Sequence, residues 1–455
     1  MGLYVTPLLC WGSKEIPMNE LAVRLQEQIC SVNPTVYEML SGLGKRMYFP
    51  SKGILSQSAE AKKLAGNFNA TIGTALENKT AMNLPCVMDS LPGISPNDAL
   101  LYAPSYGIKS LREAWKAKIL HDNPSLVGVP FSLPVVTNGL TQALSLVGDL
   151  FVDPGDVVLM PDLNWDNYLL NFDDRLQADL RFFPLFNRDG GMGVDGLKAL
   201  LDQAKPGEKR LVILNFPNNP TGYTPSEAEG QALADALLAA AERGVRIVAL
   251  VDDAYFGLFY APDSMKQSLF VKLANRSRNL VAIKADAATK ECYVWGLRVG
   301  FLSFSVGGAD SDDCPLFSAL EAKAAGEIRA TVSNCSALSQ RVVDRALRNP
   351  AFYDQREHCA QIMRERYQET VKVFQDHPEY AEHFRPYPFN SGYFMCIHLN
   401  ALGADAVRRH LLDHYGAGTI AMGEQNLRVA FSSLNLDQVA PLFQVIYQAC
   451  RDLAN

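Results

Sequence analysis

Short apolar runs alternate with helical segments across the middle of this chain, and that alternation restricts the folds open to it. Apolar runs occupy residues 157–160, 211–216, 245–251 and 280–283, and a helical pattern covers about 225–243. The runs are almost continuously apolar, as strands buried on both faces of a sheet are. We therefore expect a largely parallel sheet with crossover helices.

The two ends of the chain follow other patterns. Helical stretches near 19–30 and 56–66 lie among many turn residues, 315–375 is mostly helical, and strands are expected at 392–397 and 427–431. A chain of 455 residues is also too long for one compact core. We expect the chain to form a second, smaller unit beside the parallel sheet.

The predicted fold class is α/β: a large domain with a mostly parallel sheet flanked by helices, plus a smaller α+β domain made from both chain ends. We assign residues 106–345 to the large domain. Residues 1–105 would supply an N-terminal segment and part of the small domain, and residues 346–455 its C-terminal part.

Charge and cysteine usage narrow the function classes. A net charge of -7 lacks the basic excess that neutralises phosphates, so we expect neither nucleic acid nor a membrane as a partner. No signal-peptide pattern or membrane-spanning apolar stretch is recognised. The nine cysteines are scattered and odd in number, which favours reduced thiols in the cytoplasm over disulfides or a zinc site. Met1-Gly2 with Thr6 fits a loose myristoylation pattern, but one acyl chain without a basic patch anchors poorly.

One glycine motif matches a dinucleotide-binding pattern but lacks the context that such a site needs. Gly191, Gly193 and Gly196 match the GxGxxG dinucleotide fingerprint, which needs a buried strand running directly into it. The polar segment 187–190 precedes them instead. We interpret the motif as an exposed turn before a helix.

Two informative segments follow expected strands, where open parallel sheets bind ligands. Gly139, in Thr-Asn-Gly-Leu-Thr-Gln, would leave helix N–H groups facing an anion, although ordinary strand-to-helix turns also use glycine. Asn219 lies in Pro-Asn-Asn-Pro-Thr-Gly directly after the strand expected at 211–215, where a rigid turn is the alternative.

Charged residues follow two further strands. Asp252 ends a very apolar run and needs a cationic partner if it is buried, although it could equally cap the next element. Lys290 comes shortly after the strand at 280–283 and could simply reach solvent. Arg298, in an apolar context, requires an anion because guanidinium keeps its charge.

Together these segments indicate the chemistry of one kind of cofactor site. A lysine forms a Schiff base with an aldehyde cofactor, a carboxylate keeps a pyridine nitrogen protonated, and an arginine with a helix N-terminus holds a phosphate. The ordered set resembles the fold-type-I pyridoxal-phosphate aminotransferases of class I/II, the family of aspartate aminotransferase. The residues that carry the resemblance are Tyr102 with Gly107, Gly139, Trp165, Asn219-Pro220-Thr221-Gly222, Asp252 with Tyr255, Lys290, Arg298 and Arg428.

The resemblance implies roles around the cofactor ring. Lys290 would carry pyridoxal phosphate as a Schiff base and move a proton during catalysis, with Asp252 pairing with the pyridine nitrogen. Asn219 and Tyr255 would hydrogen-bond the phenolic oxygen, and Trp165 would stack on the ring.

The resemblance also implies the phosphate seat and a partner subunit. Arg298 and the turn at Gly139, Leu140 and Thr141 would hold the phosphate. Tyr102 resembles the tyrosine that reaches a partner subunit's phosphate, which implies a homodimer with shared active sites.

For the substrate, Arg428 resembles the arginine that binds the α-carboxylate, with a lone arginine in an edge strand as the alternative. Arg329, four residues before Ser333, resembles the arginine that reads a second carboxylate, or is a surface residue on a helix. The aromatic residues near Tyr255 would equally suit an aromatic substrate or core packing.

Two departures from the family pattern stand out. Ala287 occupies the position of a phosphate-binding serine, for which Thr141 or Thr289 could compensate. The early glycine segment that contacts substrate is not evident at 82–86.

The sequence thus predicts an aminotransferase that moves an amino group between an L-amino acid and a 2-oxo acid. A pyridoxal-phosphate lyase on the same fold is the alternative, because the cofactor residues are shared. A non-catalytic transcriptional sensor is a third hypothesis, but residues 1–100 show no basic helix-turn-helix pattern.

Overall fold

The computed structural model describes residues 18–50 and 53–454. The possible myristoylation pattern at Met1, Gly2 and Thr6, and Cys10, lie outside these residues. A seven-stranded sheet of order β4-β10-β9-β8-β7-β5-β6 forms the centre of the molecule. Its strands are β4 (Val135–Thr137), β5 (Val157–Pro161), β6 (Asp179–Phe183), β7 (Lys209–Asn215), β8 (Arg246–Asp252), β9 (Leu280–Ala287) and β10 (Gly300–Val306).

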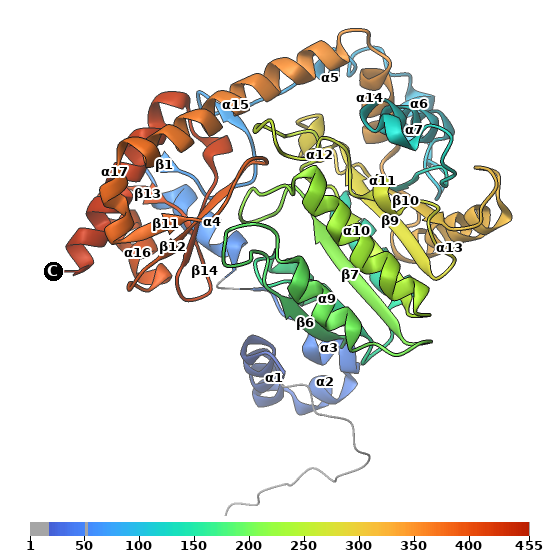
Figure 1. Ribbon diagram of the computed structural model, residues 1–455, viewed down its shortest axis with the longest axis horizontal. Coiled ribbons are helices and arrows are strands. Elements are labelled where there is room, and N and C mark those ends of the chain that lie inside the picture. Colours follow the sequence, from blue (N-terminus) through green and yellow to red (C-terminus); the bar gives the residue numbers. More distant parts are fainter. Residues whose placement is uncertain (1–17, 51–52, 455) are drawn as a thin grey trace, which may run out of the picture.

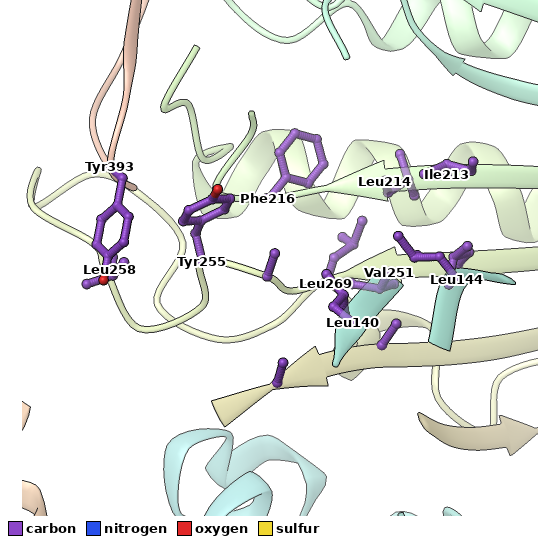
Figure 2. Close-up of a cluster of buried hydrophobic side chains, with 14 of the residues drawn as sticks. Leu140, Leu144, Ile213, Leu214, Phe216, Val251, Tyr255, Leu258, Leu269 and Tyr393 are labelled. Atoms are coloured by element: carbon purple, nitrogen blue, oxygen red, sulfur yellow. The ribbon is translucent and has the colours of Figure 1, made fainter. Parts of the chain in front are cut away.

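The pairing of these strands confirms the predicted α/β fold. The strands from β9 to β6 run parallel to one another, whereas β10 is antiparallel to both β9 and β4. Sequence analysis did not predict β6 or β10. The apolar runs are buried, and Figure 2 shows Ile213 and Leu214 of β7 and Val251 of β8 packed in one cluster with Leu140 and Leu144.

Helices cover the sheet and connect its strands. The capping box of Ser226 and Glu229 starts α10, which lies beside α9 along the sheet (Figure 1). The helices of this part are α5 (Pro85–Met88), α6 (Pro96–Leu100), α7 (Lys109–Asp122), α8 (Leu140–Phe151), α9 (Val194–Asp202), α10 (Glu227–Glu242), α11 (Phe270–Leu273), α12 (Ala288–Glu291), α13 (Pro315–Thr331) and α14 (Ala337–Leu347), with single-turn or irregular helices η1 (Pro124–Leu126) and η2 (Leu169–Arg175). The predicted turn before α9 is present at Gly191–Gly193, but Gly193 is buried rather than exposed, and Gly196 lies inside the helix.

A smaller unit combines elements from the two ends of the chain, as predicted, around a second sheet made of C-terminal strands. Its order is β11-β12-β15-β14, all antiparallel, and β1 pairs with β13 beside it. In Figure 1 the blue α4 and β1 lie among the orange and red C-terminal elements. The elements are α4 (Ile54–Leu64), β1 (Phe68–Asn69), β2 (Leu76–Glu77), β3 (Thr80–Ala81), β11 (Phe384–Pro386), β12 (Met395–Leu399), α16 (Ala404–Tyr415), β13 (Ala417–Gly418), β14 (Ile420–Met422), β15 (Asn426–Val429), α17 (Leu436–Ala454), η3 (Pro378–Glu382) and η4 (Phe431–Ser433). The domain boundaries at 105 and 345 stay predictions.

The long helix α15 (Phe352–Asp376) packs on α17 and also contacts α5 (Figure 1). At the other end of the chain, α1 (Glu20–Val32), α2 (Pro34–Met39) and α3 (Gly42–Arg46) form a small helical group. Arg46 attaches this group through a 3.0 Å hydrogen bond to the carbonyl of Asp174. No helix in the described part of the chain is both long and apolar enough to cross a membrane.

One strand is longer than the sequence predicted. The apolar run ends at Ile283, because Lys284 and Asp286 follow, yet β9 continues to Ala287. Lys284 is buried and lies 3.2 Å from Asp286, so the two charges compensate each other inside the protein.

Candidate active site

A cavity of about 250 Å³ opens where the parallel strands end. Asn215 and Asp252, which end β7 and β8 side by side, form part of its wall. The predicted site residues that line the cavity are Leu140, Thr141, Trp165, Asn219, Asp252, Tyr255, Lys290, Arg298 and Arg428. The structure therefore brings together side chains from strand ends spread over nearly 300 positions of sequence.

Lys290 lies on the short helix α12, directly after β9, and its side chain reaches the cavity. Its Nζ is 4.7 Å from the centre of the Tyr255 ring. Burial lowers the pKa of Lys290 to about 8; the nearby Asp252 opposes this shift, and Arg298 adds to it. A lower pKa leaves a larger share of the amine neutral, and the neutral amine is the nucleophilic form.

Asp252 is almost fully buried at the end of β8. Its carboxylate accepts hydrogen bonds from the Tyr168 phenol at 2.5 Å and from the Ala254 N–H at 3.0 Å. Burial raises the pKa of Asp252 to about 6, while these hydrogen bonds and the nearby Lys290 favour the ionised form. A buried carboxylate in this setting is suited to bind a cationic group in the cavity.

Tyr168 is a site residue that sequence reasoning missed. It lines the cavity three residues after Trp165, and the two rings meet edge to face with centres 5.7 Å apart. The spacing from Trp165 was the available signal, since residues three apart share one side of a helical turn. One short segment thus supplies both an aromatic wall and the hydrogen-bond donor to Asp252.

One end of the cavity is built for an anion. Gly139 has φ +77°, and a Cβ there would lie 2.4 Å from Arg298 Nη2, so a larger residue does not fit. The first turn of α8, with Leu140 and Thr141, presents free N–H groups at the same place. Thr289 adds a buried hydroxyl that has no hydrogen-bond partner among the described residues.

A second cationic group also lines the cavity. Arg428 is buried on β15, between β12 and β14, so the edge-strand alternative is wrong. Its guanidinium donates to Asn219 Oδ1 at 3.0 Å and to the carbonyl of Thr71 at 2.9 Å. Its Nε is buried and has no partner among the described residues, which leaves a donor for a ligand.

Gly73 and Ile54 also line the cavity, and sequence reasoning found neither. A Cβ at residue 73 would lie 2.9 Å from the Phe394 ring and 3.3 Å from the Tyr255 hydroxyl. An early glycine, Gly73, thus lies at the cavity, two residues after Thr71, whose carbonyl accepts a hydrogen bond from Arg428.

Gly139 adjoins the cavity through Arg298 without lining it, and two other predicted residues lie outside the cavity. Tyr102 is 92% exposed, and Arg329 is exposed with its guanidinium bonded to the Ser333 hydroxyl. The segments that carry them meet, because Ser105 Oγ donates to the carbonyl of Ser333 at 2.8 Å. Neither reaches the cavity of its own chain.

The cavity thus combines an amine of lowered pKa, a buried carboxylate, an aromatic wall and two guanidinium groups from different segments. Such a set can hold a ligand with two anionic groups and a cationic nitrogen. In the part of the chain that the structure describes, no three His, Cys, Asp or Glu side chains gather as metal ligands would.

Comparison with known proteins identifies the family. The family described as aminotransferase class I and II matches residues 69–446. The chain is 27% identical to the 2-aminoadipate transaminase of Thermus thermophilus, over 75% of this chain and 79% of that protein. It is 29% identical to a probable aspartate/prephenate aminotransferase of Aquifex aeolicus, over 56% of this chain but only 58% of that protein.

A solved structure agrees at the level of the fold. The aminotransferase from Anaerococcus prevotii superposes with a TM-score of 0.77 at 22% identity, covering 90% of this chain and 98% of that one. This likeness, the match over most of the chain and the strand-end cavity all agree with the resemblance seen in the sequence. The chain belongs to the class I and II aminotransferases.

Proposed function

We propose that this chain is a pyridoxal-phosphate-dependent aminotransferase that moves an amino group between an L-amino acid and a 2-oxo acid, with Lys290 as the residue that bonds to the cofactor. One observation carries the proposal. Lys290 has a lowered pKa and shares a cavity with the buried Asp252 and Arg428 and with the exposed Arg298. The family and the names of the relatives favour transamination over the lyase alternative.

The anion-binding end of the cavity fits the phosphate of pyridoxal phosphate. Arg298, the first turn of α8 and the Thr141 and Thr289 side chains would hold it. The unpartnered Thr289 hydroxyl is the best support, because a buried hydroxyl without a partner costs free energy until a ligand satisfies it. Thr289 would then replace the serine that is missing at Ala287.

The middle of the cavity fits the cofactor ring. When bound, pyridoxal phosphate supplies an aldehyde that reacts with amines and a pyridine ring that withdraws electrons from the substrate's α-carbon. Asp252 would hold the ring nitrogen protonated and Trp165 would lie against the ring face. Asn219 and Tyr255 would bind the phenolic oxygen. Burial keeps the pKa of Tyr255 above its usual value, so its phenol stays a hydrogen-bond donor.

Two further residues act on the substrate. Arg428 would bind its α-carboxylate, using the buried Nε that has no other partner among the described residues. Lys290 Nζ would move the proton from the substrate's α-carbon to the C4′ carbon of the cofactor, because a base with a pKa near the working pH transfers protons most effectively.

A homodimer completes the proposal. The surface around Tyr102 also exposes Leu100 and Leu101, at 80% and 63%, and adjoining exposed apolar side chains mark interaction surfaces. In a dimer, Tyr102 and Arg329 would extend to the partner's cavity, where they would contact the phosphate and a second substrate carboxylate. We propose the cytoplasm as the location, which the scattered, odd-numbered cysteines favour.

The test is to incubate the protein and pyridoxal phosphate with one amino acid and one 2-oxo acid at a time. Formation of the matching new amino acid and new 2-oxo acid supports transamination. Release of ammonia or pyruvate without a new amino acid would favour the lyase. A cofactor-bound protein that changes no substrate would point to the sensor.

A further inference from the structure

The chain neighbours of Asp252 and Lys290 point away from the cavity into one buried ion network. Asp253 follows Asp252 at the end of β8, and Glu291 follows Lys290 on α12. Both carboxyls are nearly fully buried, at 1% and 3% exposure, and neither lines the cavity. Each of the two proposed catalytic residues is therefore followed directly in the chain by a buried carboxyl group.

The first half of the network lies around Lys284, in the middle of β9. Its ammonium contacts the Asp253 carboxylate directly and lies 3.2 Å from Asp286. Ser268 Oγ donates to Asp253 at 2.6 Å, and Trp115 Nε1 donates to Asp286 at 3.1 Å. Asp253 is thus held by two side chains from two different segments.

The second half lies around Lys118 of α7. Its ammonium contacts Glu291 and lies 2.8 Å from Asp122. Arg356 of α15 donates from both terminal nitrogens to Asp122 at 2.9 Å and lies 3.9 Å from Glu291. Trp115 joins the halves, because it donates to Asp286 and carries the Lys118 ammonium over its ring at 4.7 Å.

Stability alone does not account for this arrangement. Removing several ions from water is expensive, and well-packed apolar side chains in their place are often equally stable or more so. Burial raises the pKa of Asp253, and it raises that of Glu291 to about 7. What the network does supply is fixed geometry, since each carboxyl is held by partners from other elements.

We propose that Asp253 and Glu291 are positioning residues for the transamination: through this network they fix the backbone at Asp252 and Lys290, and so the separation of the two catalytic side chains. The inference rests on the proposed function. Catalytic groups need support that holds them to about 0.5 Å, and a displacement of about 1 Å costs on the order of 100-fold in rate.

The test compares neutral, isosteric variants of the holoenzyme. Glu291→Gln and Asp253→Asn each remove one charge of the network without removing volume. Glu321→Gln is the matched control: it weakens a largely buried pair with Arg112, at 2.7 Å, that adjoins no residue of the cavity. For each variant we would measure kcat, KM, the thermal midpoint of unfolding and the pH midpoint of the visible absorbance of bound pyridoxal phosphate.

We expect Glu291→Gln and Asp253→Asn to lower kcat by about tenfold or more, with KM changed less than about twofold, and to move the pH midpoint of the absorbance. Glu321→Gln should change only the thermal midpoint. If one network variant fails to fold, the other decides. If the network variants behave like Glu321→Gln, with kcat and the absorbance midpoint unchanged, the positioning inference is overturned but the proposed function still stands. A wild-type protein that binds no pyridoxal phosphate would overturn the proposed function and the inference with it.

Discussion

The Tyr168 phenol donates a 2.5 Å hydrogen bond to Oδ2 of Asp252, and both side chains are buried. Burial raises the pKa of the Asp252 carboxyl, the neighbouring Asp253 adds to this shift, and the hydrogen bond from Tyr168 is the largest effect that opposes it. Because burial keeps the pKa of Tyr168 well above its usual value, the phenol remains a donor. Tyr168 therefore helps to keep a negative charge where the proposed pyridine nitrogen needs one.

Replacing Tyr168 by Phe tests this relationship. Loss of a hydrogen bond to a charged group costs about 1.5–3 kcal/mol, which corresponds to a roughly 10- to 100-fold weaker Kd for pyridoxal phosphate. Tyr223→Phe is the control, since Tyr223 donates in the same way to Glu229 at 2.8 Å but does not line the cavity. Titration of the apoprotein with the cofactor gives both Kd values. Equal affinities in the two variants would disprove the role of Tyr168.

Gly139→Ala tests the anion-binding end. The added Cβ would displace the Arg298 guanidinium, which lies 2.4 Å from its position, and alanine is strained at φ +77°. Gly155→Ala carries the same strain at φ +86°, but its Cβ meets open space. We expect both variants to lose stability and only Gly139→Ala to bind pyridoxal phosphate at least about tenfold more weakly. Titration calorimetry with pyridoxal phosphate would measure the affinity of each variant. Similar affinities in the two variants would contradict the prediction.

The lowered pKa of Lys290 predicts a pH dependence for cofactor capture. Burial lowers this pKa to about 8, and the protonated amine below that pH cannot attack an aldehyde. The rate at which apoprotein captures pyridoxal phosphate should therefore rise with pH through a midpoint of about 8 and then level off. Stopped-flow absorbance measures this rate. The same measurement with Nα-acetyl-lysine, which keeps a free side-chain amine, gives the pH dependence that comes from the cofactor itself. A midpoint near the ordinary lysine value of 10.5 would rule out the proposed environment.

If the chain forms the proposed dimer, its mass in solution should be that of two chains, and a substitution in the interface should lower that mass. Wild-type protein should sediment at twice the 50.0 kDa chain mass. Leu101→Asp should shift it toward the monomer, because a buried, unpaired charge is costly at an apolar interface. Val127→Asp changes another strongly exposed apolar residue and should leave the mass unchanged. A fully active 50 kDa wild-type protein would refute the shared active site.

Much of the site could be predicted because its residues follow recognisable strands. Asp252 comes directly after an apolar run, and Gly139 and Asn219 lie in short glycine- and proline-bearing turns that local sequence reveals. The positions that the structure adds depend on distant pairing instead. Gly73 belongs to a segment with little regular structure, placed by the pairing of Phe68 with Ala417 almost 350 residues away.

The charged interior of the fold was hidden for a different reason. Lys284 and Asp286 looked like the polar end of a strand, because a single sequence does not show that Asp253 forms an ion pair with Lys284. The antiparallel strand β10 was missed because Ser303 and Ser305 interrupt its apolar residues, although both are fully buried. Lys284 and Asp253 compensate each other across a distance in sequence, and Ser305 donates to the carbonyl of Pro130 at 2.7 Å.

The most direct test of the central claim is to find which lysine bonds to the cofactor. Holoenzyme would be treated with borohydride, which makes the bond between lysine and pyridoxal phosphate permanent, and then digested for mass spectrometry. We predict that the cofactor mass is attached to the peptide that contains Lys290. Attachment to another lysine, or an unmodified Lys290 in protein with bound cofactor, would contradict the proposed mechanism.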